Sequence, residues 1–169
     1  EFSKLRPPNI DSIWSSLYVF SDKIFGPTFF LKPYFNSGIS FVSLAIFVSV
    51  ILFYLAFRWR RGKFHYLWDT TFIIASFLLT SKVYSPQFNL WLVPLLVICG
   101  LNYKKIILYD LLNLLVAWAV YQYFQEVFIA GRDILTFPYF KLFTAFVFLR
   151  HGLLLWLTYD LWRLRKNYD

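Results

Sequence analysis

The stretch that decides the fold reads Lys82-Val-Tyr-Ser-Pro-Gln-Phe-Asn-Leu-Trp91, and it separates two apolar runs, 72–79 and 90–101. Pro86 has no amide proton and disfavours helical geometry at Ser85, so one helix is predicted to end just before this pair and another to begin after it. The break also carries five polar side chains, which need water, a partner or a ligand in so apolar a chain. We therefore expect a site at this break, facing one side of a membrane.

Composition indicates a membrane protein. Charged residues make up 15% of the 169-residue chain, against about 25% in soluble domains, and hydrophobic residues make up 59%. The net charge of +8 would suggest nucleic acid binding in a soluble protein, but here the basic residues flank apolar segments, as they do in cytoplasmic loops. We expect a multi-pass integral protein of a prokaryotic plasma membrane or an ER-type membrane. Membrane lipids are its expected partners, and nucleic acid is not.

The two ends of the sequence and its cysteine content add two expectations. The sequence begins at Glu1, contains no methionine and shows no signal-peptide pattern, so we expect the C-terminal part of a longer membrane protein. Residues 1–169 are expected to form a single membrane-embedded domain. The one cysteine, Cys99, lies in an apolar run, which predicts a packed small side chain and excludes a disulfide framework within the chain.

Hydropathy predicts an all-α, polytopic fold with about five transmembrane helices. Their predicted ranges are 39–57, 66–83, 88–101, 106–124 and 140–162. The dense basic segments 58–63 and 163–166 are predicted to be cytoplasmic, which places Ser85 and Arg132 outside. An alternative topology makes 72–101 a re-entrant hairpin, and we rank it lower because its two arms together are long enough to cross twice.

An outer-surface segment, residues 1–38, is predicted to precede the transmembrane bundle of 39–169. Within it, 10–25 has the pattern of an interfacial amphipathic helix, because apolar residues recur on one arc while serines and charged residues fill the other. Leu17 belongs to the apolar arc and is expected to be buried. Ser16 belongs to the polar arc and is expected to be exposed.

Arg150 is a further candidate for chemistry, because it lies about ten residues into an apolar helix. An arginine at such a depth costs at least ~2.5 kcal/mol on insertion scales. It can serve as a phosphate contact, for which a guanidinium is well shaped, or it can snorkel or form a structural ion pair. We weigh these interpretations equally. The two histidines, His65 and His151, are isolated in the sequence, so no metal site is predicted.

The polar residues of the break can present donors to an anionic or hydroxyl-rich ligand at the outer surface. The structural alternative is a satisfied turn between helices, with its aromatic residues in the membrane interface. Two N-terminal residues lie on the same predicted side and could complete a combined outer site. The candidate donor- and substrate-binding residues are Arg6, Asp11, Lys82, Tyr84, Ser85, Gln87 and Arg150.

The break also carries a family resemblance. The pattern Lys-Val-Tyr-Ser-Pro-Gln-Phe-x-x-Trp-Leu-x-Pro at 82–94 resembles a segment of GT-C fold glycosyltransferases, above all the polyprenyl-phosphate-dependent mannosyltransferases of glycosyltransferase family 87. The segment Arg-Pro-Pro-Asn-Ile-Asp-Ser at 6–12 is similar to an Arg-x-x-x-Ile-(Glu/Asp)-Ser segment of that family, with Asp11 in place of the commoner Glu. Arg150 resembles a recurring family position in the last helix.

This resemblance implies a membrane enzyme that works without a cofactor or metal. It would move a hexose, mannose in that family, from a polyprenyl-phosphate donor to a lipid or glycan acceptor on the outer or lumenal face. The catalytic base, an Asp or Glu in the first outer loop, is expected upstream of this sequence, so no catalytic residue is assigned here. Arg6, Lys82 and Arg150 would stabilise the leaving phosphate, and Tyr84 and Gln87 would orient the sugar or phosphate.

The alternative function is a membrane transporter or flippase for a lipid-linked or anionic substrate. A broken helix and an arginine within the membrane fit that class as well. Against it, polar residues for a path through the inner half are sparse, essentially Asp110 and Asn113, and Asp110 is expected to pair with Lys104 or Lys105. A non-catalytic scaffold subunit stays as a third class.

Overall fold

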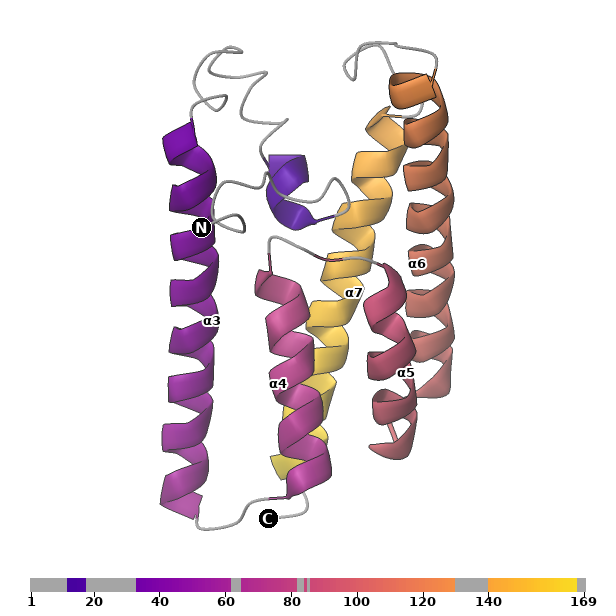
Figure 1. Cartoon of the computed structure of the whole chain (residues 1–169). Helices are drawn as coiled ribbons and strands as arrows, with labels where there is room; N and C mark the ends of the chain where they lie inside the picture. Colours follow the sequence, from indigo (N-terminus) through magenta and orange to yellow (C-terminus); the bar gives the residue numbers. More distant parts are fainter. Residues whose placement is uncertain are drawn as a thin grey trace.

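The described part of the chain is helical throughout. The computed structural model describes residues 12–17, 33–61, 65–81, 84, 86–129 and 140–166, and these form helices and turns but no strand (Figure 1). The elements are α3 (Pro33–Arg61), α4 (Tyr66–Thr80), a 3-10 turn η1 (Pro86–Phe88), α5 (Asn89–Ile98), α6 (Tyr103–Tyr123), a π-helical turn η2 (Phe124–Ile129) and α7 (Phe140–Lys166). The all-α prediction is confirmed.

Three of these helices, α3, α6 and α7, are long and apolar enough to cross a membrane. The qualifying segments are Gly38–Arg60, Tyr103–Glu126 and Lys141–Leu164, each of 23 or 24 residues. At ~1.5 Å per residue they reach roughly 35 Å, which exceeds a hydrocarbon core of about 30 Å. They overlap the first, fourth and fifth predicted spans, and they are compatible with a membrane location.

The other two predicted spans are short helices. α4 has 15 residues and α5 has 10, so they reach only roughly 22 Å and 15 Å. They run in opposite directions, and the break between them lies near the middle of the height of α3 and α7 (Figure 1). The predicted count of five spans is therefore not confirmed. The pair has the form of a hairpin that turns inside the bundle.

The helices pack in a fixed order around α4 and α7. α4 lies between α3 and α7, while α7 also packs against α6, and α5 packs against α4 and α6 (Figure 1). The main core joins leucines of α5 and α7, namely Leu92, Leu96, Leu154, Leu157 and Leu161. A smaller cluster joins α6 and α7 through Val116, Ala119, Phe143 and Val147. This packing brings the α4–α5 break against the middle of α7.

The polarity of the bundle is inverted relative to a soluble protein. Charged and amide side chains are buried inside it, namely Arg58, Asp69, Asn89, Asn113 and Arg150. Large apolar side chains cover its outside, among them Phe41, Leu52, Leu90, Leu114 and Leu155. In lipid the hydrocarbon outside is as apolar as leucine, so apolar residues lose nothing by facing it, whereas polar groups gain from facing each other.

Within residues 12–17, the burial of Leu17 and Ser16 is the reverse of the prediction. Leu17 is 42% exposed, whereas Ser16 is buried, and Trp14 donates its indole N–H to the last carbonyl of α4 at 2.7 Å. The prediction of a buried Leu17 and an exposed Ser16 is wrong. Small serines permit close helix contacts, and an apolar exterior suits leucine. The rest of the predicted helix 10–25 lies outside the described residues.

The predicted basic loop 58–63 is in its first part a continuation of α3. Arg58 is buried in that helix, with its Nε 3.8 Å from Asp69 Oδ1 on α4. Tyr54 donates its hydroxyl to the same oxygen, and the other carboxylate oxygen accepts the His65 N–H at 2.7 Å. Arg58 is thus a structural ion-pair partner that links α3 to α4, and it is not a loop cation.

A second ion pair links α6 to α7. Lys105 Nζ contacts Asp160 Oδ2 and lies over the Trp156 ring at 3.8 Å. Asp110 was predicted to pair with Lys104 or Lys105, and for Lys105 this is wrong, because its partner is Asp160. Five residues on a helix correspond to about 140° of rotation, which points Asp110 away from Lys105 and leaves it exposed.

Candidate functional site

The break brings a tyrosine into the centre of the bundle. Ser81 donates its backbone N–H to Phe77 at the end of α4, and the chain is extended there. Tyr84 follows, fully buried, and the turn η1 then starts α5 at Asn89. Because Tyr84 lies between two helix ends, its side chain projects into the space that α5, α6 and α7 share.

Three polar groups meet at the break, namely the hydroxyls of Tyr84 and Tyr109 and the side-chain amide of Asn89. The Tyr84 hydroxyl donates to Asn89 Oδ1 at 3.0 Å, and the Tyr109 hydroxyl of α6 donates to the same oxygen at 2.7 Å. The two tyrosine hydroxyls also contact each other. Each hydroxyl has one proton, so two protons serve three oxygen contacts, and either tyrosine alone can satisfy Asn89 Oδ1.

Arg150 faces the same cluster from α7. Its guanidinium carbon lies 4.0 Å from the centre of the Tyr84 ring, and its Nη1 donates to Asn113 Oδ1 of α6 at 3.3 Å. Arg150 is 0% exposed. A cation over a desolvated tyrosine ring is stabilised by roughly 2 kcal/mol, which helps to offset the cost of its burial.

His151 completes the cluster and adds an unmatched atom. Its ring meets the Tyr84 ring edge-on, with centroids 5.2 Å apart. His151 Nδ1 lies 2.8 Å from the Val147 carbonyl, which assigns the proton to Nδ1 and leaves Nε2 as an acceptor. Within the described residues, His151 Nε2 and the Asn89 amide nitrogen have no hydrogen-bond partner although both are buried. The cluster therefore offers one acceptor and one donor to a ligand.

The structure brings together only part of the predicted site. Of the predicted residues, Tyr84 and Arg150 are in direct contact. Gln87 is exposed in the turn η1. Four further candidates, Arg6, Asp11, Lys82 and Ser85, lie outside the described residues.

Sequence reasoning missed four members of this cluster. Asn89 and His151 were not considered for it, Tyr109 was not noticed, and Asn113 was assigned only to a possible transport path. The available signal was Tyr109 with Asn113, because polar residues four apart in an apolar helix share one face. Among the described residues, no group of three or more metal-binding side chains comes together.

Comparisons of the chain with known protein families, with curated proteins and with solved structures find no match.

Proposed function

We propose that this chain is part of a multi-pass membrane glycosyltransferase, in which it binds a polyprenyl-phosphate hexose donor. The observation that carries the proposal is the Arg150 guanidinium held against Tyr84 of the Tyr-Ser-Pro-Gln break. The resemblance of that break to family 87 mannosyltransferases gives the sugar class. In the proposed topology the basic ends of α3 and α7 are cytoplasmic, and the break opens toward the outer or lumenal side.

The proposed reaction is a displacement at the anomeric carbon of the hexose. An acceptor hydroxyl oxygen forms the new bond to that carbon, the bond to the phosphate oxygen breaks, and polyprenyl phosphate leaves with the electron pair. The hydroxyl proton goes to a carboxylate that the resemblance assigns to a residue outside this sequence. Negative charge grows on the phosphate during the step, so a preorganised guanidinium stabilises the transition state more than the ground state.

Two electropositive features meet at the cluster and support an anionic ligand. Arg150 carries a full charge, and the N-terminus of α5 at Asn89 carries the positive end of a helix dipole. The unmatched Asn89 amide can donate to a phosphate or sugar oxygen. The unmatched His151 Nε2 can accept from a sugar hydroxyl. A sugar phosphate offers both kinds of partner in one molecule.

The alternative, a transporter or flippase, has one observation in its favour. The short helices α4 and α5 meet inside the bundle, and broken helices that meet at depth are typical of transport sites. A flippase would move an anionic lipid past Arg150 without cleaving it. Transfer of sugar and movement of intact lipid are separable measurements, so one experiment can distinguish the two functions.

The test is transfer of labelled hexose from a polyprenyl-phosphate donor by the complete protein in detergent. Arg150→Ala is expected to lower transfer by about 100-fold or more, the magnitude typical of a lost transition-state donor. Arg150→Lys keeps the charge but loses the planar fork, and it is expected to lower transfer as well. Lys141→Ala, which removes an exposed cation from the same helix, is the matched control and is expected to be silent.

All variants are compared at equal amounts of folded protein. Full activity of Arg150→Ala would show that the buried cluster is structural and would remove the basis of the proposal. Movement of intact labelled donor across vesicles, with no transfer in the wild-type protein, would assign the chain to the flippase class.

A further inference from the structure

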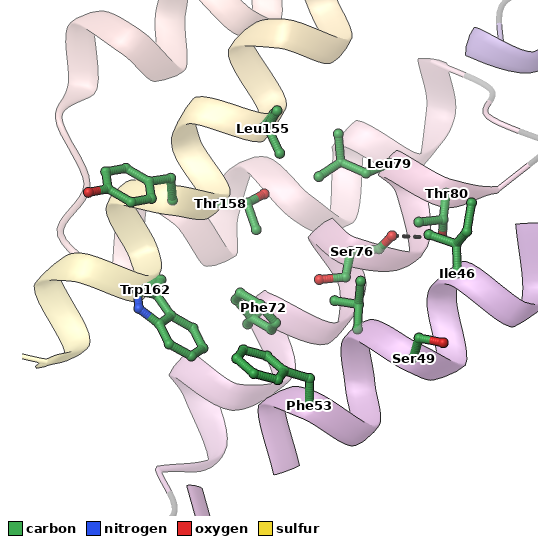
Figure 2. A pocket seen from close by; sticks show the side chains of 12 residues that line it. Ile46, Ser49, Phe53, Phe72, Ser76, Leu79, Thr80, Leu155, Thr158 and Trp162 are labelled. Atoms are coloured by element: carbon green, nitrogen blue, oxygen red, sulfur yellow. Dashed lines mark hydrogen bonds between the residues drawn. The ribbon is translucent and has the colours of Figure 1, made fainter. Parts of the chain in front are cut away.

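A separate apolar groove runs between α3 and α7 with α4 as its floor. Its volume is about 720 Å³. Figure 2 shows Ile46, Ser49 and Phe53 of α3 on one side, Leu155, Thr158 and Trp162 of α7 on the other, and Phe72 and Ser76 of α4 between them. α3 packs along α4, and it also contacts α7 where Trp162 packs against Phe53 and Phe57.

The lining of the groove suits a hydrocarbon chain. Its two threonines, Thr80 and Thr158, donate their hydroxyls to carbonyls of their own helices, at 2.9 Å and 2.8 Å. They therefore add methyl groups and no free donors to the wall. Phe53 and Leu155 at the rim are strongly exposed, which makes the groove continuous with the apolar outside of the bundle. In a bilayer, lipid chains surround this rim.

One end of the groove is closed by aromatic rings and followed by cations. Trp162 stacks with Phe53 at 6.3 Å between centroids and packs on Phe57 at 4.6 Å. Arg163 follows Trp162 directly, and Arg60 lies two turns beyond Phe53 on the same face of α3. Both arginines are exposed. An apolar slot that ends in exposed cations is complementary to an anionic lipid.

We propose that this groove holds an acyl chain of an anionic glycerophospholipid, with its phosphate at Arg60 and Arg163. The inference rests on the membrane placement proposed above and does not depend on transferase activity. The site differs from the Arg150 cluster in position and in chemistry, because it lies on the other face of α4 and presents its cations to the membrane surface. The bound lipid would fill the gap between α3 and α7 and hold α3 in place.

The test is native mass spectrometry of the complete, delipidated protein in detergent, titrated with dioleoyl phosphatidylglycerol or dioleoyl phosphatidylcholine. One lipid per chain is expected, with phosphatidylglycerol preferred by about fivefold for each arginine that reaches the phosphate. Ser49→Trp places a ring in the groove and is expected to lower retention of both lipids at least fivefold. Leu52→Trp adds the same ring to an exposed position of α3 outside the groove and is the matched control.

Charge and packing are tested separately. Arg60→Gln with Arg163→Gln is expected to abolish the preference for phosphatidylglycerol while phosphatidylcholine binding stays. Ile46→Trp, at the rim, is a second filling variant if Ser49→Trp does not fold. Wild-type retention in a folded filling variant would overturn the proposal. Detection of a dimer of the chain without bound lipid would also overturn the proposal, since a second copy of the chain would then occupy the groove. The hexose transfer assay on the same proteins shows independently whether the transferase proposal stands.

Discussion

Tyr84 and Tyr109 share one hydrogen-bond acceptor at the break. We therefore predict that removing their two hydroxyls has strongly non-additive effects on the free energy of unfolding. Tyr84→Phe and Tyr109→Phe each remove one hydroxyl and leave the ring in place. In either single variant the remaining tyrosine still donates to Asn89 Oδ1, at 2.7 Å or 3.0 Å. In the double variant both of these hydroxyl donors to Asn89 Oδ1 are gone.

The expected magnitudes follow from this redundancy. A hydrogen bond between helices in a membrane contributes about 0.6 kcal/mol on average and about 1.7 at most, so each single change is expected to cost roughly 0.5–1.5 kcal/mol. The double change also strands a buried carbonyl oxygen, which costs about 1–3 kcal/mol. The loss of unfolding free energy in the double variant should therefore exceed the sum of the losses in the two single variants by roughly 1 kcal/mol or more.

The assay is equilibrium unfolding of the four proteins in mixed micelles, analysed as a double-mutant cycle. Tyr121→Phe, an exposed tyrosine on α6, is the control and is expected to leave the free energy of unfolding unchanged. Independent sites add within about 0.3–0.5 kcal/mol. If the losses of unfolding free energy in the two single variants added up to the loss in the double variant within that range, the shared-acceptor geometry would be refuted, even if both single variants were destabilised.

Two further predictions concern the basic end of the bundle. Asp69→Ala is expected to lower the free energy of unfolding by about 3–5 kcal/mol, because it leaves Arg58 buried without its carboxylate. Adding Arg58→Leu should recover part of this loss. A loss below ~1 kcal/mol in Asp69→Ala would contradict the prediction. In a Cys99→Ser background, new cysteines at Arg60 and Tyr103 are expected to react with an impermeant maleimide from the same side of the membrane, because α3 ends and α6 begins at one end of the bundle. Labelling from opposite sides would show that the α4–α5 pair crosses an odd number of times.

Much of the fold follows from local sequence. Apolar runs and the Ser85–Pro86 break predict the five α-helices between residues 33 and 166, because helix formation depends on local chemistry and on length. The sequence did not predict η1 or η2, and α3 begins at Pro33, inside the segment 1–38 that was predicted to precede the bundle. Cys99 was predicted to be packed, and it is buried beside Thr71, with 3.4 Å between sulfur and hydroxyl. For Arg150 the sequence left a phosphate contact and a structural role equally weighted, and the structure shows the side chain buried against Asn113 and Tyr84.

The depth of the break and the packed face of each helix could not be predicted in the same way. An apolar arc marks the buried face only where the exterior is water, and in the membrane placement proposed above it does not, which accounts for the exposed Leu17. The contacts of Asn89 with Tyr109 and of Arg150 with Tyr84 join residues 20 and 66 positions apart in sequence. No periodicity encodes such pairs, since they depend on how whole helices are placed.

In the membrane placement proposed above, α4 and α5 end at the break inside the bilayer. A helix that ends within a bilayer leaves backbone groups that water cannot reach, so the chain must supply partners from its own side chains. At the end of α4, Trp14 Nε1 and Ser43 Oγ donate to the Thr80 carbonyl, whereas the side chains of Tyr84, Asn89 and Tyr109 bond to one another. A simple turn needs no cation, yet Arg150 is brought to within 4.0 Å of Tyr84, beside the positive end of α5. Both features are next to Tyr84, with Arg150 over its ring and Asn89 of α5 at its hydroxyl, so both would attract an anion bound close to Tyr84. This electrostatic argument favours a phosphate-bearing ligand over a purely structural turn.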